Sequence, residues 1–146
     1  MPARSHARLH ARLTADGLSV EAAQAFVADR AAGAVVVFTG TVRDHSEGRD
    51  VAGLTYEAYA ERAQSQLDTL AAEVARRFPD VVAVWLEHRT GGLAVGEPSV
   101  VVAVSTPHRE EAFAAARWAI DELKATVAIW KQEHWTGGGG HWPGTP

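Results

Sequence analysis

Cysteine is absent from this chain of 146 residues, and lysine is nearly absent. Without cysteine the chain can form no disulfide, no thiolate metal site and no cysteine nucleophile, so any sulfur chemistry must use sulfur carried by another molecule. No apolar run approaches the roughly 20 residues that span a membrane, and the basic N-terminus has no apolar run of signal-peptide length. From these absences we expect a cytoplasmic protein.

The composition excludes several other classes. A net charge of −4 gives no electrostatic support to a nucleic-acid partner. The chain has no P-loop, no G-x-S-x-G and no H-E-x-x-H pattern, so neither a serine hydrolase nor a histidine metal site is expected. The length fits one domain with a real core, and we interpret residues 1–146 as that domain, with residues 1–6 and 136–146 as flexible tails.

Lysine is the informative residue. Twelve of the 14 basic side chains are arginines, and both lysines, Lys124 and Lys131, fall in Ile120–Lys131 (IDELKATVAIWK). A desolvated lysine can lose its proton and act as a base or nucleophile, and two nearby ammonium groups lower each other's pKa. A continuous helix would place both on one face, whereas a helix ending near Ala125 would let the next strand return Lys131 toward Lys124. Composition alone favours the alternative, two ordinary surface lysines in an arginine-rich chain.

Hydrophobic periodicity predicts six strands and three helices. The expected strands are Ala7–Leu13, Ala34–Val42, Val51–Tyr59, Val81–His88, Ser99–Ser105 and Val127–Glu133. The expected helices are Val20–Arg30 (N-cap Ser19), Glu61–Phe78 (ended by Pro79) and Arg109–Leu123. Ala34–Val42 is typical of a central strand, and the next strand is expected to run antiparallel to it. The order predicts an α+β fold with helices against one face of the sheet.

Basic residues also stand at two element ends. Thr106 is a good N-cap and Pro107 a good first helical residue, so the free N–H groups of that turn, with His108 and Arg109, could bind a phosphate or carboxylate. The alternative is a solvated arginine offset by its acidic neighbours. Arg43 follows the Ala34–Val42 strand, where a solvated strand end is the simpler interpretation.

In combination, five segments resemble one family, the catalytic (large) subunit of molybdopterin synthase. The segments are Gly33–Arg49 (GAVVVFTGTVRDHSEGR), Leu54–Tyr59 (LTYEAY), Glu87–Gly96 (EHRTGGLAVG), Ser105–Phe113 (STPHREEAF) and Ile120–Glu133 (IDELKATVAIWKQE). No single segment is specific for this family, but the combination of all five over about three quarters of the chain is highly specific for it.

The resemblance implies an α/β hammerhead-type fold: α+β, with an antiparallel sheet packed by helices and a small additional β subdomain. It implies conversion of cyclic pyranopterin monophosphate to molybdopterin by transfer of two sulfurs. The sulfur would come from the thiocarboxylated Gly-Gly C-terminus of a small sulfur-carrier subunit, with no permanently bound cofactor and no metal. It further implies a homodimer carrying one small subunit per protomer, and neither a nucleic-acid nor a membrane partner.

By position, the resemblance makes Lys124 and Lys131 catalytic. The substrate-binding positions that it implies are Thr41, Val42, Arg43, His108, Arg109, Gln132 and Glu133. The chain departs from the family at Ala128, where proline is common. Two alternatives remain open at this stage: a non-catalytic dimeric scaffold subunit of the same fold, and an enzyme acting on a different phosphorylated heterocycle.

Overall fold

The structure is a computed structural model that describes residues 6–143. Its elements are β1 (Arg8–Thr14), α1 (Val20–Val27), β2 (Ala34–Thr41), β3 (His45–Ser46), β4 (Arg49–Ala58), α2 (Ala60–Arg77), β5 (Ala83–Arg89), β6 (Gly91–Ala94), β7 (Pro98–Thr106), α3 (Arg109–Thr126), β8 (Ile129–Trp135) and β9 (Gly140–His141). All nine predicted elements are present. The short strands β3 and β6 were not among the predicted elements, and β9 lies in the segment expected to be a flexible tail.

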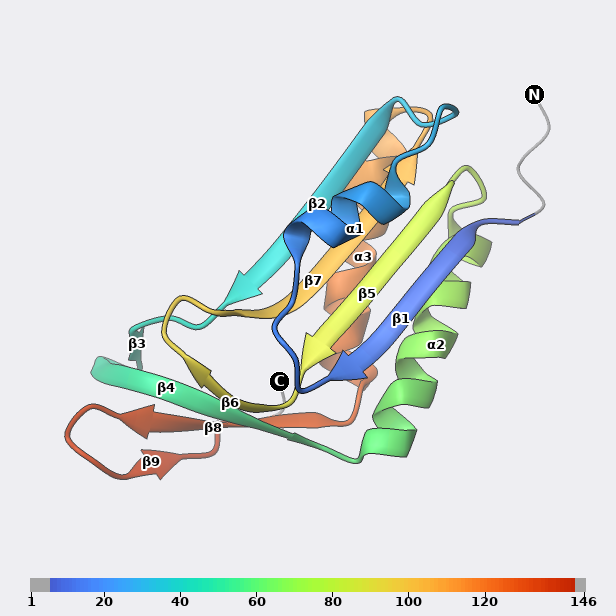
Figure 1. Cartoon of the computed structure of the whole chain (residues 1–146). Coiled ribbons are helices and arrows are strands. Elements are labelled where there is room, and N and C mark those ends of the chain that lie inside the picture. The colour runs from blue at the N-terminus through green and yellow to red at the C-terminus, as the bar shows by residue number, and fades with distance from the viewer. Residues whose placement is uncertain (1–5, 144–146) are drawn as a thin grey trace.

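A four-stranded sheet with the order β1-β5-β7-β2 forms the larger part of the molecule (Figure 1). β1 runs parallel to β5, and the other pairs are antiparallel. The prediction of a central strand at Ala34–Val42 is wrong, because β2 lies at the edge of this sheet. Its apolar run has another cause: Val36 packs into the core on one face of the sheet and Val37 into the core on the other.

β4 belongs to a second sheet, in which it pairs with β8, β6 and β3 while β9 extends β8. The prediction that this strand runs antiparallel to the preceding long strand is therefore wrong. The local pattern could not reveal its partner, because β8 lies more than 70 residues further along the chain. The additional β subdomain is nevertheless confirmed, and so is the α+β class.

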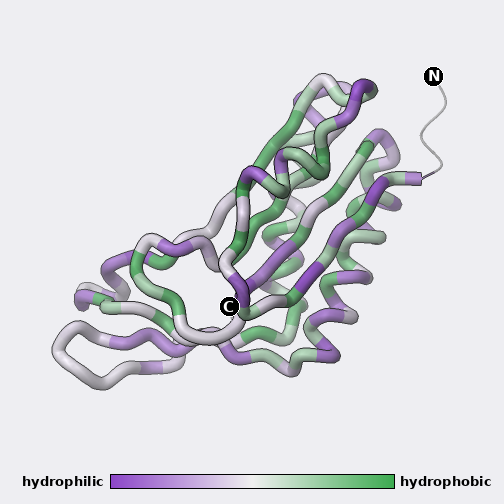
Figure 2. The backbone as a smooth tube through the Cα atoms, in the orientation of Figure 1, coloured by the Kyte–Doolittle hydropathy of each residue, from purple (hydrophilic) through white to green (hydrophobic). Residues whose placement is uncertain are grey.

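The helices lie on both faces of the four-stranded sheet. α2 and α3 cover one face, where their apolar side chains form the main core with Leu86 and Val102. α1 packs Ala23 and Val27 onto the other face, against Trp85, and lies in front of the sheet in Figure 1. The expectation of helices on one face is thus wrong for α1. Figure 2 shows the contrast between the hydrophobic residues of β2 and β7 and the white-to-purple hairpin of β8 and β9.

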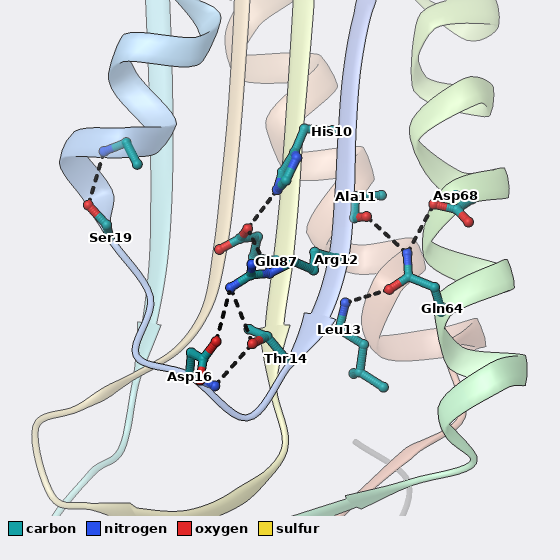
Figure 3. Close-up of polar contacts among 11 residues, drawn as sticks. His10, Ala11, Arg12, Leu13, Thr14, Asp16, Ser19, Gln64, Asp68 and Glu87 are labelled. Carbon is teal, nitrogen blue, oxygen red and sulfur yellow. Dashed lines mark hydrogen bonds and ion pairs between the residues drawn. The ribbon is translucent and has the colours of Figure 1, made fainter.

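β1 is held to its neighbours by polar contacts (Figure 3). The Gln64 side chain of α2 accepts a hydrogen bond from the Leu13 N–H at 2.8 Å and donates one to the Ala11 carbonyl at 2.9 Å. On the face of α1, His10 Nε2 donates to the buried Glu87 carboxylate at 2.6 Å and stacks on Trp85. These contacts give the edge strand a fixed register.

The expected C-terminal tail is partly ordered. Residues 136–143 form a hairpin turn, β9 and a short extension, whereas residues 1–5 and 144–146 of the expected tails lie outside the described residues. The turn uses the left-handed conformation at Gly138 and Gly139. A side chain at Gly140 would collide with the Glu133 carbonyl oxygen. Between residues 6 and 143, no helix combines the length and the apolar character needed to cross a membrane.

Candidate active site

The turn between α3 and β8 places the two lysines. α3 continues to Thr126, three residues beyond the predicted end, and the Val127 N–H closes its last turn on the Leu123 carbonyl at 3.1 Å. The Ala128 N–H donates to the Gln66 side chain of α2 at 2.8 Å, a bond that proline could not make. β8 then returns along the end of the helix, so the second of the two predicted geometries is the one present.

A cavity of about 200 Å³ lies where α3, β4, β5, β7 and β8 meet, and both Lys124 and Lys131 line it. Its floor is apolar, formed by side chains such as Val100, Ile120 and Leu123. Its polar lining groups besides the lysines are Tyr56, His88 and Ser99. A concave apolar surface with a few converging polar groups is the usual form of a small-molecule site.

Lys124 has the most informative electrostatics. Partial burial lowers the pKa of its amine below the ordinary value of 10.5, and the positive charges of Lys131 and Arg43 lower it further. The side chain nevertheless remains solvent-exposed at the cavity mouth. Three predicted site residues from α3, β8 and the loop after β2 are thus close enough to interact. A lysine in such surroundings can give up its proton more easily than one on an open surface.

Tyr56 and His88 were not predicted as site residues. Tyr56 is the cross-strand partner of Lys131, and burial raises the pKa of its phenol, an effect that Ser99 opposes and the Glu133 charge reinforces. Its ring meets the His88 imidazole edge to face at 4.8 Å. The sequence held one signal for His88. Strand alternation places it on the same face of β5 as the core residue Leu86, where a histidine is unusual.

Glu133 lies on the same face of β8 as Lys131. The residue is only 3% exposed, and other residues of the chain donate hydrogen bonds to its carboxylate. The Ser46 hydroxyl donates to Oε1 at 2.8 Å, and His141 Nε2 donates to the same oxygen at 2.6 Å. Burial acts to raise the pKa of Glu133, but these hydrogen bonds and the Lys131 charge hold it below 4.5. Gln132 falls on the opposite face of the strand by alternation. Glu133 therefore ties the β9 hairpin to the site.

The predicted positions at the end of β2 and directly after it differ in their surroundings. Val42 is buried, donates its N–H to the Glu97 carbonyl at 3.1 Å and accepts from the Gly96 N–H at 2.8 Å. Thr41 is exposed beside a register shift in β2. Of this segment, Arg43 acts on Lys124 by its charge.

His108 and Arg109 lie at the other end of α3, about 22 Å along its axis from Lys124. Both are exposed, on an open surface that also includes Pro107. The predicted N-cap is wrong: His108 occupies that position without a side-chain cap, and the Thr106 hydroxyl donates instead to the His108 carbonyl. A single chain therefore does not bring this pair to the lysine cavity.

Comparison with known proteins identifies the family. The family model described as MoaE protein matches residues 13–126. The chain belongs to the MoaE protein family. A "Molybdopterin synthase catalytic subunit" of Nostoc sp. is 46% identical over 125 residues, which cover 86% of this chain and 76% of that protein. The family assignment made from the sequence is thus confirmed.

Solved structures agree with this MoaE assignment. A molybdopterin synthase structure from Staphylococcus aureus superposes with a TM-score of 0.86 at 35% identity, covering 92% of this chain and 96% of that one. A structure described as a protein–protein complex of subunits 1 and 2 of the molybdopterin-converting factor from Helicobacter pylori has a TM-score of 0.73 at 19% identity, covering 93% and 90%. The similarity to the Helicobacter pylori structure supports the fold alone.

Among residues 6–143, no group of three or more His, Asp or Glu is arranged to hold a metal ion.

Proposed function

We propose that this chain is the catalytic subunit of a molybdopterin synthase and acts in molybdenum cofactor biosynthesis. Its substrate is cyclic pyranopterin monophosphate, and it transfers two sulfurs from the thiocarboxylated C-terminus of a small sulfur-carrier subunit. The observation that carries this proposal is the convergence of the only two lysines of the chain on one cavity of a MoaE fold. The absence of cysteine agrees with a sulfur supplied by a partner.

The cavity suits this chemistry because its rim is cationic and its floor is apolar. The pterin phosphate and the carrier's thiocarboxylate are both anions, which Lys131 and Arg43 attract. Each transfer forms one carbon–sulfur bond to the pterin side chain and breaks one carbon–oxygen bond at the same carbon, whose oxygen leaves as water or stays on the phosphate. Water then cleaves the carbon–sulfur bond to the carrier and leaves an ordinary carboxylate there. Lys124, whose pKa is lowered by burial and by its cationic neighbours, takes up or delivers protons in these steps.

The position of His108 and Arg109 supports the proposed homodimer. A pterin phosphate cannot span the length of α3, so one chain cannot offer both the lysines and this pair to the same ligand. β2 leaves an open edge on the four-stranded sheet, and exposed apolar side chains lie on or beside it: Val35, Phe38 and Phe113, the last 62% exposed. We infer that a second copy covers this region and supplies its own His108 and Arg109 to the lysine cavity.

The deciding experiment is a reconstitution. The purified chain is mixed with a thiocarboxylated small subunit and cyclic pyranopterin monophosphate, and the dithiolene product is sought by mass spectrometry. Product supports the proposal. A stable complex without product would favour a non-catalytic scaffold subunit, and ligand binding that needs no small subunit would favour an enzyme of another phosphorylated heterocycle.

A further inference from the structure

The buried histidine of the lysine cavity has one ring nitrogen in use and one free. His88 is 5% exposed and lines the cavity. Its Nδ1–H donates to the Arg89 carbonyl at 2.7 Å. Because a carbonyl can only accept, this bond places the proton of the neutral ring on Nδ1 and leaves a lone pair on Nε2. No described residue gives Nε2 a hydrogen bond.

The surroundings keep this ring neutral and oriented. Burial lowers the pKa of His88 to about 4, and the bond to the Arg89 carbonyl opposes this shift while the Lys124 charge adds to it. At neutral pH Nε2 therefore accepts hydrogen bonds and does not donate them. The edge-to-face contact with Tyr56 and the bond to Arg89 hold the ring at two points.

The lysines of the cavity have the opposite character. Lys124 and Lys131 donate hydrogen bonds when charged, whereas the Ser99 hydroxyl uses its only proton on the Gly40 carbonyl at 3.2 Å and has none left for a ligand. A ligand held only by the lysines would be selected for its acceptors and its negative charge. His88 adds an acceptor within the same cavity, where a donor of the ligand would otherwise lose its hydrogen bond with water without replacement.

We propose that His88 is a ligand-binding residue whose Nε2 accepts a hydrogen bond from a ring N–H of the nitrogen heterocycle that enters the lysine cavity. The identification of that heterocycle as the pterin of cyclic pyranopterin monophosphate rests on the proposed function. His88 then selects for the ring, and the lysines bind its anionic substituents.

Two substitutions separate this role from a structural one. His88→Asn keeps an amide N–H near the position of Nδ1, so the bond to Arg89 is retained while the acceptor is lost. His88→Gln places its amide oxygen near the position of Nε2. We expect His88→Asn to weaken binding of cyclic pyranopterin monophosphate about tenfold and His88→Gln to remain within about threefold of wild type, as one buried hydrogen bond predicts.

Binding is measured by titration calorimetry on the full chain with its small subunit, and thermal unfolding is recorded for each variant. The matched control is His45→Asn, since His45 is exposed and outside the cavity. A second readout is the ¹⁵N resonance of His88 Nε2, which should shift on ligand addition.

The outcomes separate the two proposals. Normal binding by both His88 variants, or equal loss in both with lowered melting temperatures, would overturn the role of His88 and leave the proposed function intact. A wild-type complex that does not bind the pterin would overturn the proposed function, and with it the ligand assigned to His88.

Discussion

Basic residues lie at both ends of α3, but one end lines a partly buried cavity and the other lies on an open surface. At the C-terminal end, Lys124 lies at a cavity with Lys131, and partial burial and like charge lower its pKa. At the N-terminal end, His108 and Arg109 stand on an open surface. The difference shows that a basic side chain needs more than its charge to form a reactive site, because desolvation and neighbouring charge set its proton affinity.

The Lys124→Ala variant is the most severe test of this comparison between the two ends of α3. We expect turnover in the reconstituted assay to fall about 10²- to 10⁴-fold, the usual loss for a group that transfers protons. The free energy of unfolding should change by less than about 1 kcal/mol, since the side chain is exposed at the cavity mouth. The control is Arg76→Ala, a cation in the last turn of α2 whose ion pair with Glu73 is exposed. Wild-type turnover in Lys124→Ala would remove this lysine from the mechanism.

The second test compares a buried with an exposed histidine. The pKa of His88 is about 4 when folded and 6.5 ordinarily, so below pH 6.5 the unfolded chain binds a proton that the folded chain does not. Its contribution to stability is therefore lost as pH falls from 6.5 toward 4, by up to about 3 kcal/mol. Urea unfolding of wild type and His88→Asn at pH 7, 6 and 5 should show a shallower pH dependence in the variant.

His108→Asn is the control for that measurement, because His108 is exposed at the other end of α3. It should reproduce the wild-type pH dependence. Identical slopes for wild type and His88→Asn would show that burial of His88 does not contribute to acid sensitivity.

Arg109→Ala tests whether the open end of α3 serves the same ligand. Loss of a charge-assisted hydrogen bond should weaken binding of cyclic pyranopterin monophosphate about tenfold or more without lowering the melting temperature. Arg62→Ala, an exposed arginine of α2, is the control. An unchanged binding curve would exclude Arg109 from the site.

The same variant tests the second copy. If Arg109 acts across a homodimer, mixing Arg109→Ala with Lys124→Ala should restore activity at about a quarter of the sites. Mixtures as inactive as either variant alone would argue against a site shared between copies.

The smallest expected effect concerns the hairpin beside the lysine cavity. In Gly140→Ala the added methyl group would collide with the Glu133 carbonyl, so β9 must shift, at a cost of about 1–2 kcal/mol in unfolding free energy. Gly137→Ala, with no atom within 4 Å of the added group, is the matched control. Equal chemical denaturation midpoints for the two variants would show that β9 does not depend on this close approach.

Local signals predicted the elements well. The Ser19 hydroxyl accepts from the Ala22 N–H at 3.0 Å, as an N-cap should, and α2 ends two residues before Pro79. Thr126 and Val127 indicated a helix end, but Thr126 instead donates its hydroxyl to the Glu122 carbonyl and closes the last turn. Terminal turns depend on such single contacts and are the least predictable part of a helix.

Pairings between distant segments were not predictable from local pattern. The apolar run of β2 did not distinguish a central strand from an edge strand covered on both faces. The partner of β4 lies near the C-terminus, and this same pairing sets Tyr56 beside Lys131. For that reason Tyr56 was missed, whereas the lysines were found by their rarity.

The sequence alone determined that the chain has no cysteine, that it has only two lysines and that both lie near the end of one predicted helix. It also carried enough family likeness to predict the fold. Only the tertiary structure decided that Lys124 and Lys131 share a cavity with His88 and Tyr56. The physical reason is that burial and charge proximity arise from the packing of α3 against β4, β5 and β8, which brings residues together irrespective of their spacing in the chain.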